Sequence, residues 1–226
     1  MKNGESPRAR RAVRVLIADD HEVVRIGVRT LLEAEGFKVV GEAADGRRAV
    51  ELAASLKPDI LVLDIVMPSL NGIEAARRIV KAPRAPEILI FSSRYSERLA
   101  REALEAGARG FVLKSDSGAH LVRAVEALAD GRPYFSGEVS RQLLDSFVAR
   151  TDGRPVRAGR MGTLTPREQE IIQLLAEGKS NKQVAVMLGI SVKTVETHRT
   201  NFMRKLGLHG LSDLIHYALR NNLIVV

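Results

Sequence analysis

The sequence contains no cysteine. A chain without thiols has no disulfide framework, no thiol nucleophile and no thiolate metal site, which fits a reducing compartment. Long apolar runs are also missing, because no stretch approaches the roughly 18 to 20 residues that span a bilayer. Residues 1–12 form a basic tail that lacks the apolar region and cleavage site of a secretory leader. We therefore expect a cytoplasmic protein without a membrane segment.

Low-complexity tracts and internal repeats are absent as well. The composition, 45% hydrophobic and 27% charged, is typical of a folded globular protein rather than a disordered one. A length of 226 residues exceeds that of most single compact domains. We expect one large and one small domain.

Acidic residues are fewer than lysines and arginines, and the formal net charge is +8 at pH 7. Residues 1–150 contain 24 lysines and arginines against 21 acidic residues, whereas residues 151–226 contain 11 against 6. The smaller part of the chain therefore has the larger basic excess. Such an excess favours nucleic acid as a partner, because cations near phosphates release condensed counterions. It is a weak indication, since many basic domains bind no nucleic acid.

Short apolar runs alternate with helical patterns in the first part of the chain. The predicted strands are Val13–Ala18, Phe37–Gly41, Ile60–Leu63, Ile88–Phe91 and Gly110–Leu113, and the predicted helices are Glu22–Glu35, Gly46–Leu56, Asn71–Lys81, Glu97–Ala106 and Ala119–Ala129. Continuous apolar strands indicate a parallel sheet that is covered by helices on both faces. Functional groups of such sheets gather at the carboxyl ends of the strands.

The second part of the chain has a purely helical pattern. Residues 138–148 are predicted to be helical, and residues 151–162, with little apolar content and several breakers, form a predicted linker. A new helix starts at Thr165-Pro166-Arg167-Glu168, which has the residues of an N-cap, a proline N1 and a capping box. Helices 181–188 and 192–206, joined through Gly189, predict a helix-turn-helix.

Three carboxylates are predicted to meet at one edge of the sheet. Asp19 and Asp20 follow the first strand, and Asp64 follows the third. Clustered carboxylates repel one another unless a cation compensates their charge, and Mg²⁺ prefers such oxygen ligands. Ser92 ends the fourth strand and Lys114 the fifth, so a hydroxyl and an ammonium join the same edge. Each residue alone is explained by capping or solvation, but together they predict a phosphoryl site.

Residues 13–130 resemble a receiver domain. The resemblance rests on Ala18-Asp19-Asp20, Leu63-Asp64-Ile65-Val66-Met67-Pro68, Asn71-Gly72, Phe91-Ser92-Ser93 and Gly110-Phe111-Val112-Leu113-Lys114, which match the pattern of the family in order and spacing. It implies an α/β, flavodoxin-like, doubly wound five-stranded parallel sheet with strand order 2-1-3-4-5.

The resemblance also implies the role of each residue at this edge. Asp64 would accept the phosphoryl group. Asp20, Asp64 and the Val66 carbonyl would bind Mg²⁺, and Asp19 would contact the ion through water. Ser92 and Lys114 would hold phosphoryl oxygens, and Phe111 occupies the aromatic switch position. Phe111 is equally explained as ordinary core. Ser115 replaces the proline that often follows the lysine, which leaves the geometry of that turn open.

The outward face of the helix over 192–206 is the predicted DNA surface. Val195, Phe202 and Leu206 are spaced to face a core, and His198 is expected to pack rather than to contact bases. The predicted DNA contacts are Lys193, Thr194, Glu196, Thr197, Thr200, Asn201 and Arg204. Lys193 and Thr194 lie near the helix N-terminus, where phosphates are favoured.

Residues 163–226 resemble a LuxR-type DNA-binding domain. The motifs are Leu164-Thr165-Pro166-Arg167-Glu168, Gly178-Lys179-Ser180-Asn181-Lys182 and Val192-Lys193-Thr194-Val195-Glu196-Thr197-His198. Together the two resemblances imply a response regulator of the NarL/FixJ class. It would have a receiver at 13–131, a connecting helix and linker at 132–162, and an all-α helix-turn-helix domain at 163–226.

The resemblance implies three partners: a sensor histidine kinase, double-stranded promoter DNA, and a second copy of the chain when Asp64 is phosphorylated. Relatives commonly dimerise through the last helix, here about 212–221. Two routes for the signal are open. The receiver covers the helix 192–206 until Asp64 is phosphorylated, or phosphorylation creates a receiver dimer surface.

Two other functions remain as alternatives. A magnesium-dependent phosphotransfer enzyme also places aspartates after parallel strands, but it usually needs a general acid near the nucleophile, and Asp64 is followed by Ile65-Val66-Met67-Pro68. A regulator gated by a small ligand would have merely structural carboxylates. The joint presence of Asp64, Ser92 and Lys114 disfavours it. We therefore expect a regulator and not an enzyme.

Overall fold

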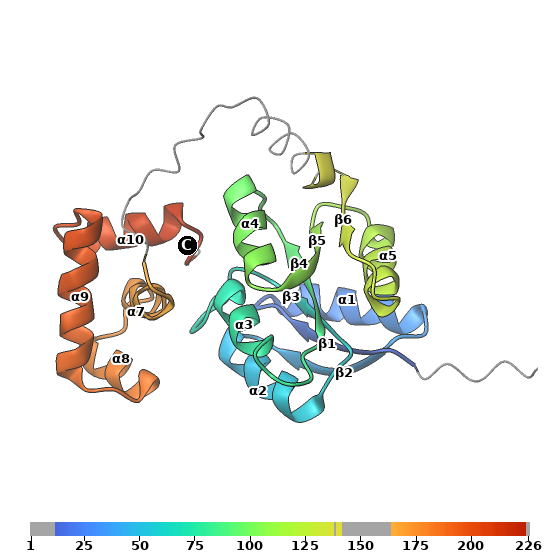
Figure 1. Cartoon of the computed structure of the whole chain (residues 1–226), viewed down its shortest axis with the longest axis horizontal. Coiled ribbons are helices and arrows are strands. Elements are labelled where there is room, and N and C mark those ends of the chain that lie inside the picture. The colour runs from blue at the N-terminus through green and yellow to red at the C-terminus, as the bar shows by residue number, and fades with distance from the viewer. Residues whose placement is uncertain (1–11, 138, 142–163, 225–226) are drawn as a thin grey trace, which may run out of the picture.

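The computed structural model describes residues 12–137, 139–141 and 164–224. These residues form a mixed α/β domain and a smaller helical domain (Figure 1). The elements of the first domain are β1 (Arg14–Ala18), α1 (Glu22–Ala34), β2 (Lys38–Ala43), α2 (Gly46–Leu56), β3 (Ile60–Leu63), α3 (Gly72–Ile79), β4 (Glu87–Ser92), α4 (Glu97–Glu105), β5 (Ala108–Leu113), α5 (Gly118–Ala129) and β6 (Tyr134–Phe135). The predicted strands and helices of this part are confirmed to within about two residues.

The sheet has six parallel strands in the order β2-β1-β3-β4-β5-β6. The first five strands follow the order that the resemblance implied. The prediction of a five-stranded sheet is wrong in one respect, because β6 adds a sixth strand beside β5. β6 consists of Tyr134 and Phe135, which pair with Gly110 and Phe111 of β5. Two residues are too few to show a strand pattern in the sequence.

Helices cover both faces of the sheet, and successive side chains of a strand point to opposite faces. In β1, Val15 and Ile17 point into a cluster with α1 and α5, whereas Leu16 and Ala18 point into a cluster with α2, α3 and α4. β3 alternates in the same way. This double covering explains why the strands have continuous apolar runs.

The helical domain consists of α7 (Pro166–Ala176), α8 (Asn181–Leu188), α9 (Val192–Leu206) and α10 (Leu211–Arg220). Thr165 caps α7 with a complete capping box, as predicted, and Gly189 ends α8 with a left-handed φ of 62°. The core includes the fully buried Val195 and Phe202 of α9. No helix in the described part of the chain is long and apolar enough to cross a bilayer.

Part of the predicted connection lies outside the described residues. Residues 137 and 139–141 are helical, but most of the helix predicted at 138–148 and the whole linker at 151–162 are not described. The basic tail also lies almost entirely outside the described residues.

Gly72 allows α3 to start directly against the segment that follows β3. A Cβ atom at Gly72 would lie 1.9 Å from the Asp64 carbonyl oxygen and 2.9 Å from the carbonyl carbon. The Gly72 N–H donates to the Ile65 carbonyl at 2.7 Å, which holds the two segments at this short separation. The missing side chain therefore lets α3 pack onto the backbone that positions Asp64.

We expect Gly72→Ala to lower the free energy of unfolding by about 1 to 3 kcal/mol, because backbone has to move to relieve the clash. Gly27→Ala is the matched control. Gly27 lies inside α1, and a Cβ atom there would meet nothing beyond its own helix within 4 Å, so this change is expected to stabilise the protein by about 0.5 to 1 kcal/mol. Urea unfolding of both variants measures the difference. Equal stability of the two would contradict the close approach at Gly72.

Candidate phosphoryl site and nucleic-acid interface

The carboxyl ends of β1 and β3 bring the predicted carboxylates together. Asp19 follows β1 and donates its N–H to the Ala43 carbonyl at 3.0 Å, while Asp64 follows β3 and donates its N–H to the Ala18 carbonyl at 2.8 Å. One ligand atom from each of Asp19, Asp20, His21 and Asp64 lies within 4.8 Å of the others. The convergence of the three aspartates is therefore confirmed, and His21 is a fourth member that the sequence pattern did not indicate.

Lys114 compensates the charge of two of these carboxylates. Its Nζ atom lies 2.5 Å from Asp19 Oδ2 and 2.8 Å from Asp64 Oδ2. Burial raises the pKa of Asp64 to about 6, although the adjacent ammonium acts in the opposite direction. Burial also lowers the pKa of Lys114, but the two carboxylates outweigh this effect and hold that pKa above its ordinary value. Lys114 is therefore charged near neutral pH.

Ser92 and the turn after β5 lie at the same edge. Ser92 is 2% exposed, and its carbonyl accepts from the Lys114 N–H at 2.8 Å, which ties the ends of β4 and β5 together. Its Oγ accepts from the Arg94 N–H at 3.2 Å. The turn at Ser115 is closed by Asp116, whose carboxylate accepts from the Leu113 N–H at 3.0 Å. The hydrogen bond between Leu113 and Asp116 therefore closes the turn without a proline after Lys114.

Phe111 is a core residue with an aromatic neighbour. It is 1% exposed, and its ring meets that of Tyr95 edge to face at a centroid distance of 5.9 Å. Tyr95 lies in the loop after β4, three residues beyond Ser92. A shift of that loop would therefore change the packing of Phe111.

The acidic edge fits a divalent metal ion. Three carboxylates and one imidazole within 4.8 Å form a donor set dominated by oxygen, which is the preference of Mg²⁺. His21 hydrogen-bonds within this group, since its backbone N–H donates to Asp19 Oδ1 at 2.9 Å. Val66, whose carbonyl is the remaining predicted ligand, lies half-buried two residues after Asp64.

Helix α9 presents the predicted DNA contacts on its surface. Lys193, Glu196, Thr197, Thr200 and Arg204 are exposed. Two further predicted contacts, Thr194 and Asn201, are half-buried.

The start of α9 is fixed by its cap and by the core beneath it. Ser191 caps the helix by accepting from the Thr194 N–H at 3.0 Å. The Thr197 hydroxyl donates to the Lys193 carbonyl at 2.9 Å, so part of its hydrogen-bonding capacity is used within the helix. His198 is half-buried, as predicted for a packing residue.

The two domains meet through α7 and the end of α10, and α9 lies on the side away from the receiver (Figure 1). Gln173 of α7 contacts the loop between β3 and α3, and Asn221 and Asn222 contact Arg98 and Arg94 near the start of α4. This arrangement differs from the route in which the receiver covers the helix 192–206. Periodicity gave no signal for these contacts, because Gln173 and Glu170 fit solvated positions of an amphipathic helix.

Comparison with known proteins places both domains. The model of the response regulator receiver domain matches residues 15–126, and that of bacterial regulatory proteins of the luxR family matches residues 162–218. The transcriptional regulatory protein LiaR of Bacillus subtilis is 38% identical over 213 residues, covering 94% of this chain and 99% of LiaR.

Two solved structures of the response regulator RcsB are also similar. RcsB of Salmonella typhimurium has a TM-score of 0.63 at 28% identity, covering 91% of this chain and 96% of that one. A structure of two RcsB dimers bound to two parallel DNAs has a TM-score of 0.55 at 28% identity, covering 92% and 98%. The chain belongs to the LuxR family of two-component response regulators, DNA-binding regulators of transcription with an N-terminal receiver domain.

Proposed function

We propose that phosphorylation of Asp64 by a sensor histidine kinase switches the binding of this protein to promoter DNA. The observation that carries the proposal is the position of the Lys114 ammonium, 2.5 Å from Asp19 and 2.8 Å from Asp64. A fixed cation beside a carboxylate nucleophile stabilises the charge that spreads over a transferred phosphoryl group.

The chemistry is a transfer between two side chains. An Asp64 carboxylate oxygen attacks the phosphorus of a phosphohistidine on the kinase, the phosphorus–nitrogen bond breaks, and the imidazole leaves with its electron pair. The product is an acyl phosphate. With a pKa of about 6, Asp64 is mostly ionised at neutral pH and thus able to attack. Ser92 and Lys114 would donate hydrogen bonds to the phosphoryl oxygens.

Asp19, Asp20 and Asp64 would hold Mg²⁺, with the Val66 carbonyl as a further ligand and His21 at the rim of the group. The ion supplies positive charge to the phosphoryl oxygens when bound. The donor set supports this assignment, because its ligand atoms lie within 4.8 Å of one another.

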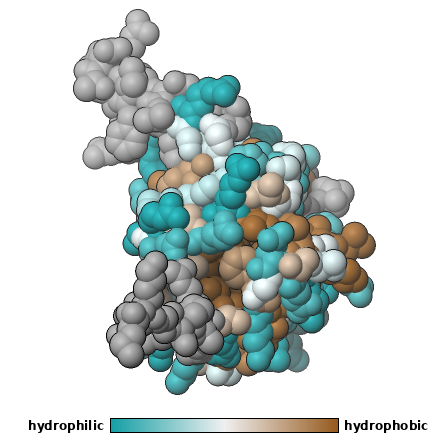
Figure 2. All heavy atoms as spheres, turned by 90° about the vertical axis from the view of Figure 1, so that its right-hand side faces the viewer, coloured by the Kyte–Doolittle hydropathy of each residue, from teal (hydrophilic) through white to brown (hydrophobic). Residues whose placement is uncertain are grey.

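The region beside Asp64 offers a surface for the kinase. Helix α1 begins at Glu22, next to the acidic edge, and its Val23 and Ile26 are 82% and 54% exposed. The face of the receiver that points away from the helical domain also has hydrophobic area among hydrophilic area (Figure 2). Exposed apolar residues next to a reacting group suit contact with another protein. The proposed acceptor is Asp64 of this chain itself, so we propose a regulator and not an enzyme that turns over a separate substrate.

The DNA interface is the exposed face of α9. Glu196, Thr197 and Thr200 would reach base edges in the major groove, and Lys193 would contact phosphate. Thr194, Asn201 and Arg204 complete the surface. RcsB has been solved as dimers on DNA, and a dimer of this chain would bind two half-sites about 10 base pairs apart.

Asp64→Asn is expected to abolish phosphorylation while the fold stays intact, because the amide is nearly isosteric but a far poorer nucleophile. Incubation with acetyl phosphate and Mg²⁺, followed by mass spectrometry of the intact protein, measures the label. Asp59→Asn is the control, since Asp59 is an exposed aspartate of the same domain and should leave the labelling unchanged. Undiminished labelling of Asp64→Asn would refute the assignment.

Lys193→Ala and Thr200→Ala are expected to affect DNA binding differently. Loss of one phosphate contact should weaken binding to all sequences about equally and make the salt slope less negative by roughly 0.9. Loss of the Thr200 hydroxyl should instead change the preference for one base pair, by about 1 kcal/mol. Binding of both variants to a panel of single-base-pair changes at several salt concentrations tests this. Altered base preference in Lys193→Ala with an unchanged slope would contradict it.

A further inference from the structure

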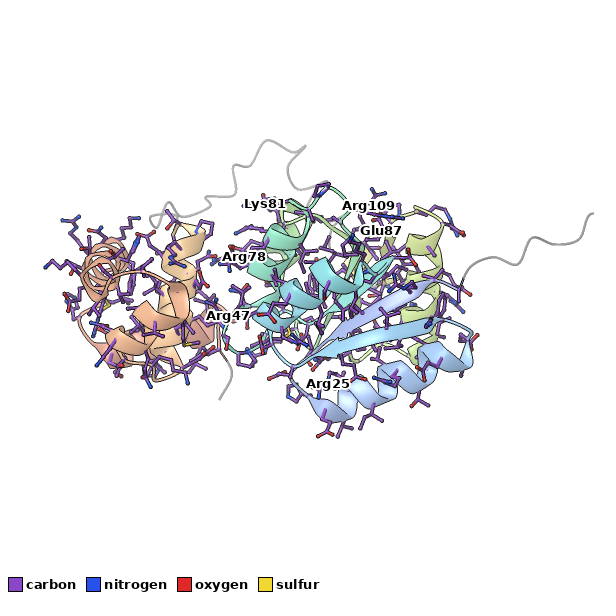
Figure 3. All side chains as sticks on the ribbon, turned by 90° about the horizontal axis from the view of Figure 1, so that it is seen from below. Arg25, Arg47, Arg78, Lys81, Glu87 and Arg109 are labelled. Atoms are coloured by element: carbon purple, nitrogen blue, oxygen red, sulfur yellow. The ribbon has the colours of Figure 1, made fainter. Side chains whose placement is uncertain are left out.

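A buried polar cluster joins α7 to the receiver. Glu170 is 1% exposed, and its carboxylate lies 2.5 Å from Arg47 Nη2 and 2.8 Å from Arg78 Nη2. Arg47 and Arg78 extend from α2 and α3 on the side of the receiver that faces the helical domain (Figure 3). Arg167, which lies in α7 like Glu170, adds a third guanidinium, with its Nη1 atom 2.9 Å from Glu170 Oε2. These complementary charges therefore fix where α7 is placed on the receiver.

Beside this cluster, side chains of α7 and of the residue after it hydrogen-bond to the backbone of the loop between β3 and α3. Gln173 is fully buried, its amide nitrogen donates to the Met67 carbonyl at 2.7 Å, and its amide oxygen accepts from the Asn71 N–H at 2.9 Å. Glu177 accepts from the Ser69 N–H at 3.1 Å. Ser69 has a φ of 67°, which lies in the left-handed region that residues with a side chain adopt uncommonly. We call the contacts of Glu170, Gln173 and Glu177 with the receiver the α7 latch.

The loop after Ser92 is tied to the same domain. Arg94 donates to the Asn222 side chain at 2.8 Å, and Arg98 donates to that of Asn221 at 2.9 Å. In this arrangement the Ser92 Oγ accepts from the Arg94 N–H at 3.2 Å. The helical domain therefore holds both loops that follow the proposed acceptor and the proposed phosphoryl-binding hydroxyl.

Neither set of contacts uses the DNA-reading face. Glu196, Thr197 and Thr200 stay exposed while the domains are docked. The docked arrangement leaves α9 free but restrains the surroundings of Asp64, which is only 5% exposed and accepts from the Ile65 N–H of the held loop at 2.7 Å. A phosphoryl group at this buried carboxylate therefore has to be accommodated by the loops that α7 and the end of α10 hold.

We propose that the α7 latch controls the phosphorylation of Asp64 and not the access of DNA to α9. Gln173 is then a positioning residue for the loop after Asp64. Because contacts that stabilise one loop conformation disfavour any other, docking disfavours the phosphorylated state, and phosphorylation weakens docking by the same free energy. The restrained loops also slow the transfer itself. This inference rests on the proposed function of Asp64.

Gln173→Glu tests the latch within the full chain. The carboxylate still accepts from Asn71 but no longer donates to Met67, and it adds negative charge beside Glu177. Gln183→Glu is the matched control, because it makes the same change at an exposed capping position of α8, where glutamate also completes a capping box. Domain separation is followed by energy transfer between dyes at Glu126→Cys and Val186→Cys, two exposed positions in a chain without native cysteine.

Three results are expected for Gln173→Glu. Energy transfer falls, the initial rate of labelling by acetyl phosphate rises about fivefold or more, which is the lower end of common coupling strengths, and the affinity of the unphosphorylated protein for a single DNA half-site stays within about twofold. Retained DNA binding also shows that the helical domain is folded. Gln183→Glu should match the wild type in energy transfer and labelling.

Unchanged energy transfer in Gln173→Glu, or a labelling rate equal to that of the control, would overturn the inference. A marked rise in half-site affinity would overturn it too, because docking would then shield the DNA surface. A label that persists in Gln173→Glu combined with Asp64→Asn counts against the proposed function itself. An equal labelling rate with a label that depends on Asp64 contradicts the latch alone.

Discussion

The ammonium group of Lys114 lies between the carboxylates of Asp19 and Asp64, which are 2% and 5% exposed. Parallel strands force these two like charges to the same edge, and without a cation they would take up protons. Burial already raises the pKa of Asp64 to about 6. The need for positive charge at this edge unites the lysine, the proposed metal-binding donor set and the proposed phosphoryl site.

The loops that leave this edge also form the contact with the DNA-binding domain. Gln173 holds the backbone at Met67 and Asn71, and Asn222 contacts Arg94 in the loop after Ser92. A chemical event at Asp64 therefore acts on segments that α7 and the end of α10 already touch. The distance between Asp64 and α9 is bridged by the helical domain, in which α7 and α9 share one core.

Local pattern was sufficient for most of the receiver and for the carboxylate edge. Alternating apolar strands and capped helices are encoded within about a dozen residues, and the strand ends that carry Asp19, Asp64 and Lys114 follow from parallel pairing. β6 was missed because two residues are too few to show a periodic pattern. His21 was missed because only the spatial closeness of its ring to the aspartates makes it a ligand candidate. The contacts of Glu170 and Gln173 depend on how two domains dock, which no periodicity within one helix reports.

The central claim is that one carboxylate controls DNA binding by the whole chain. The most direct test measures the affinity of the full-length protein for a two-half-site DNA, selected from a random pool, before and after treatment with acetyl phosphate and Mg²⁺. We predict tighter binding after treatment of the wild type and no change for Asp64→Asn. Equal gains in the two proteins, or no gain in a wild type shown to carry the phosphoryl group, would contradict the account.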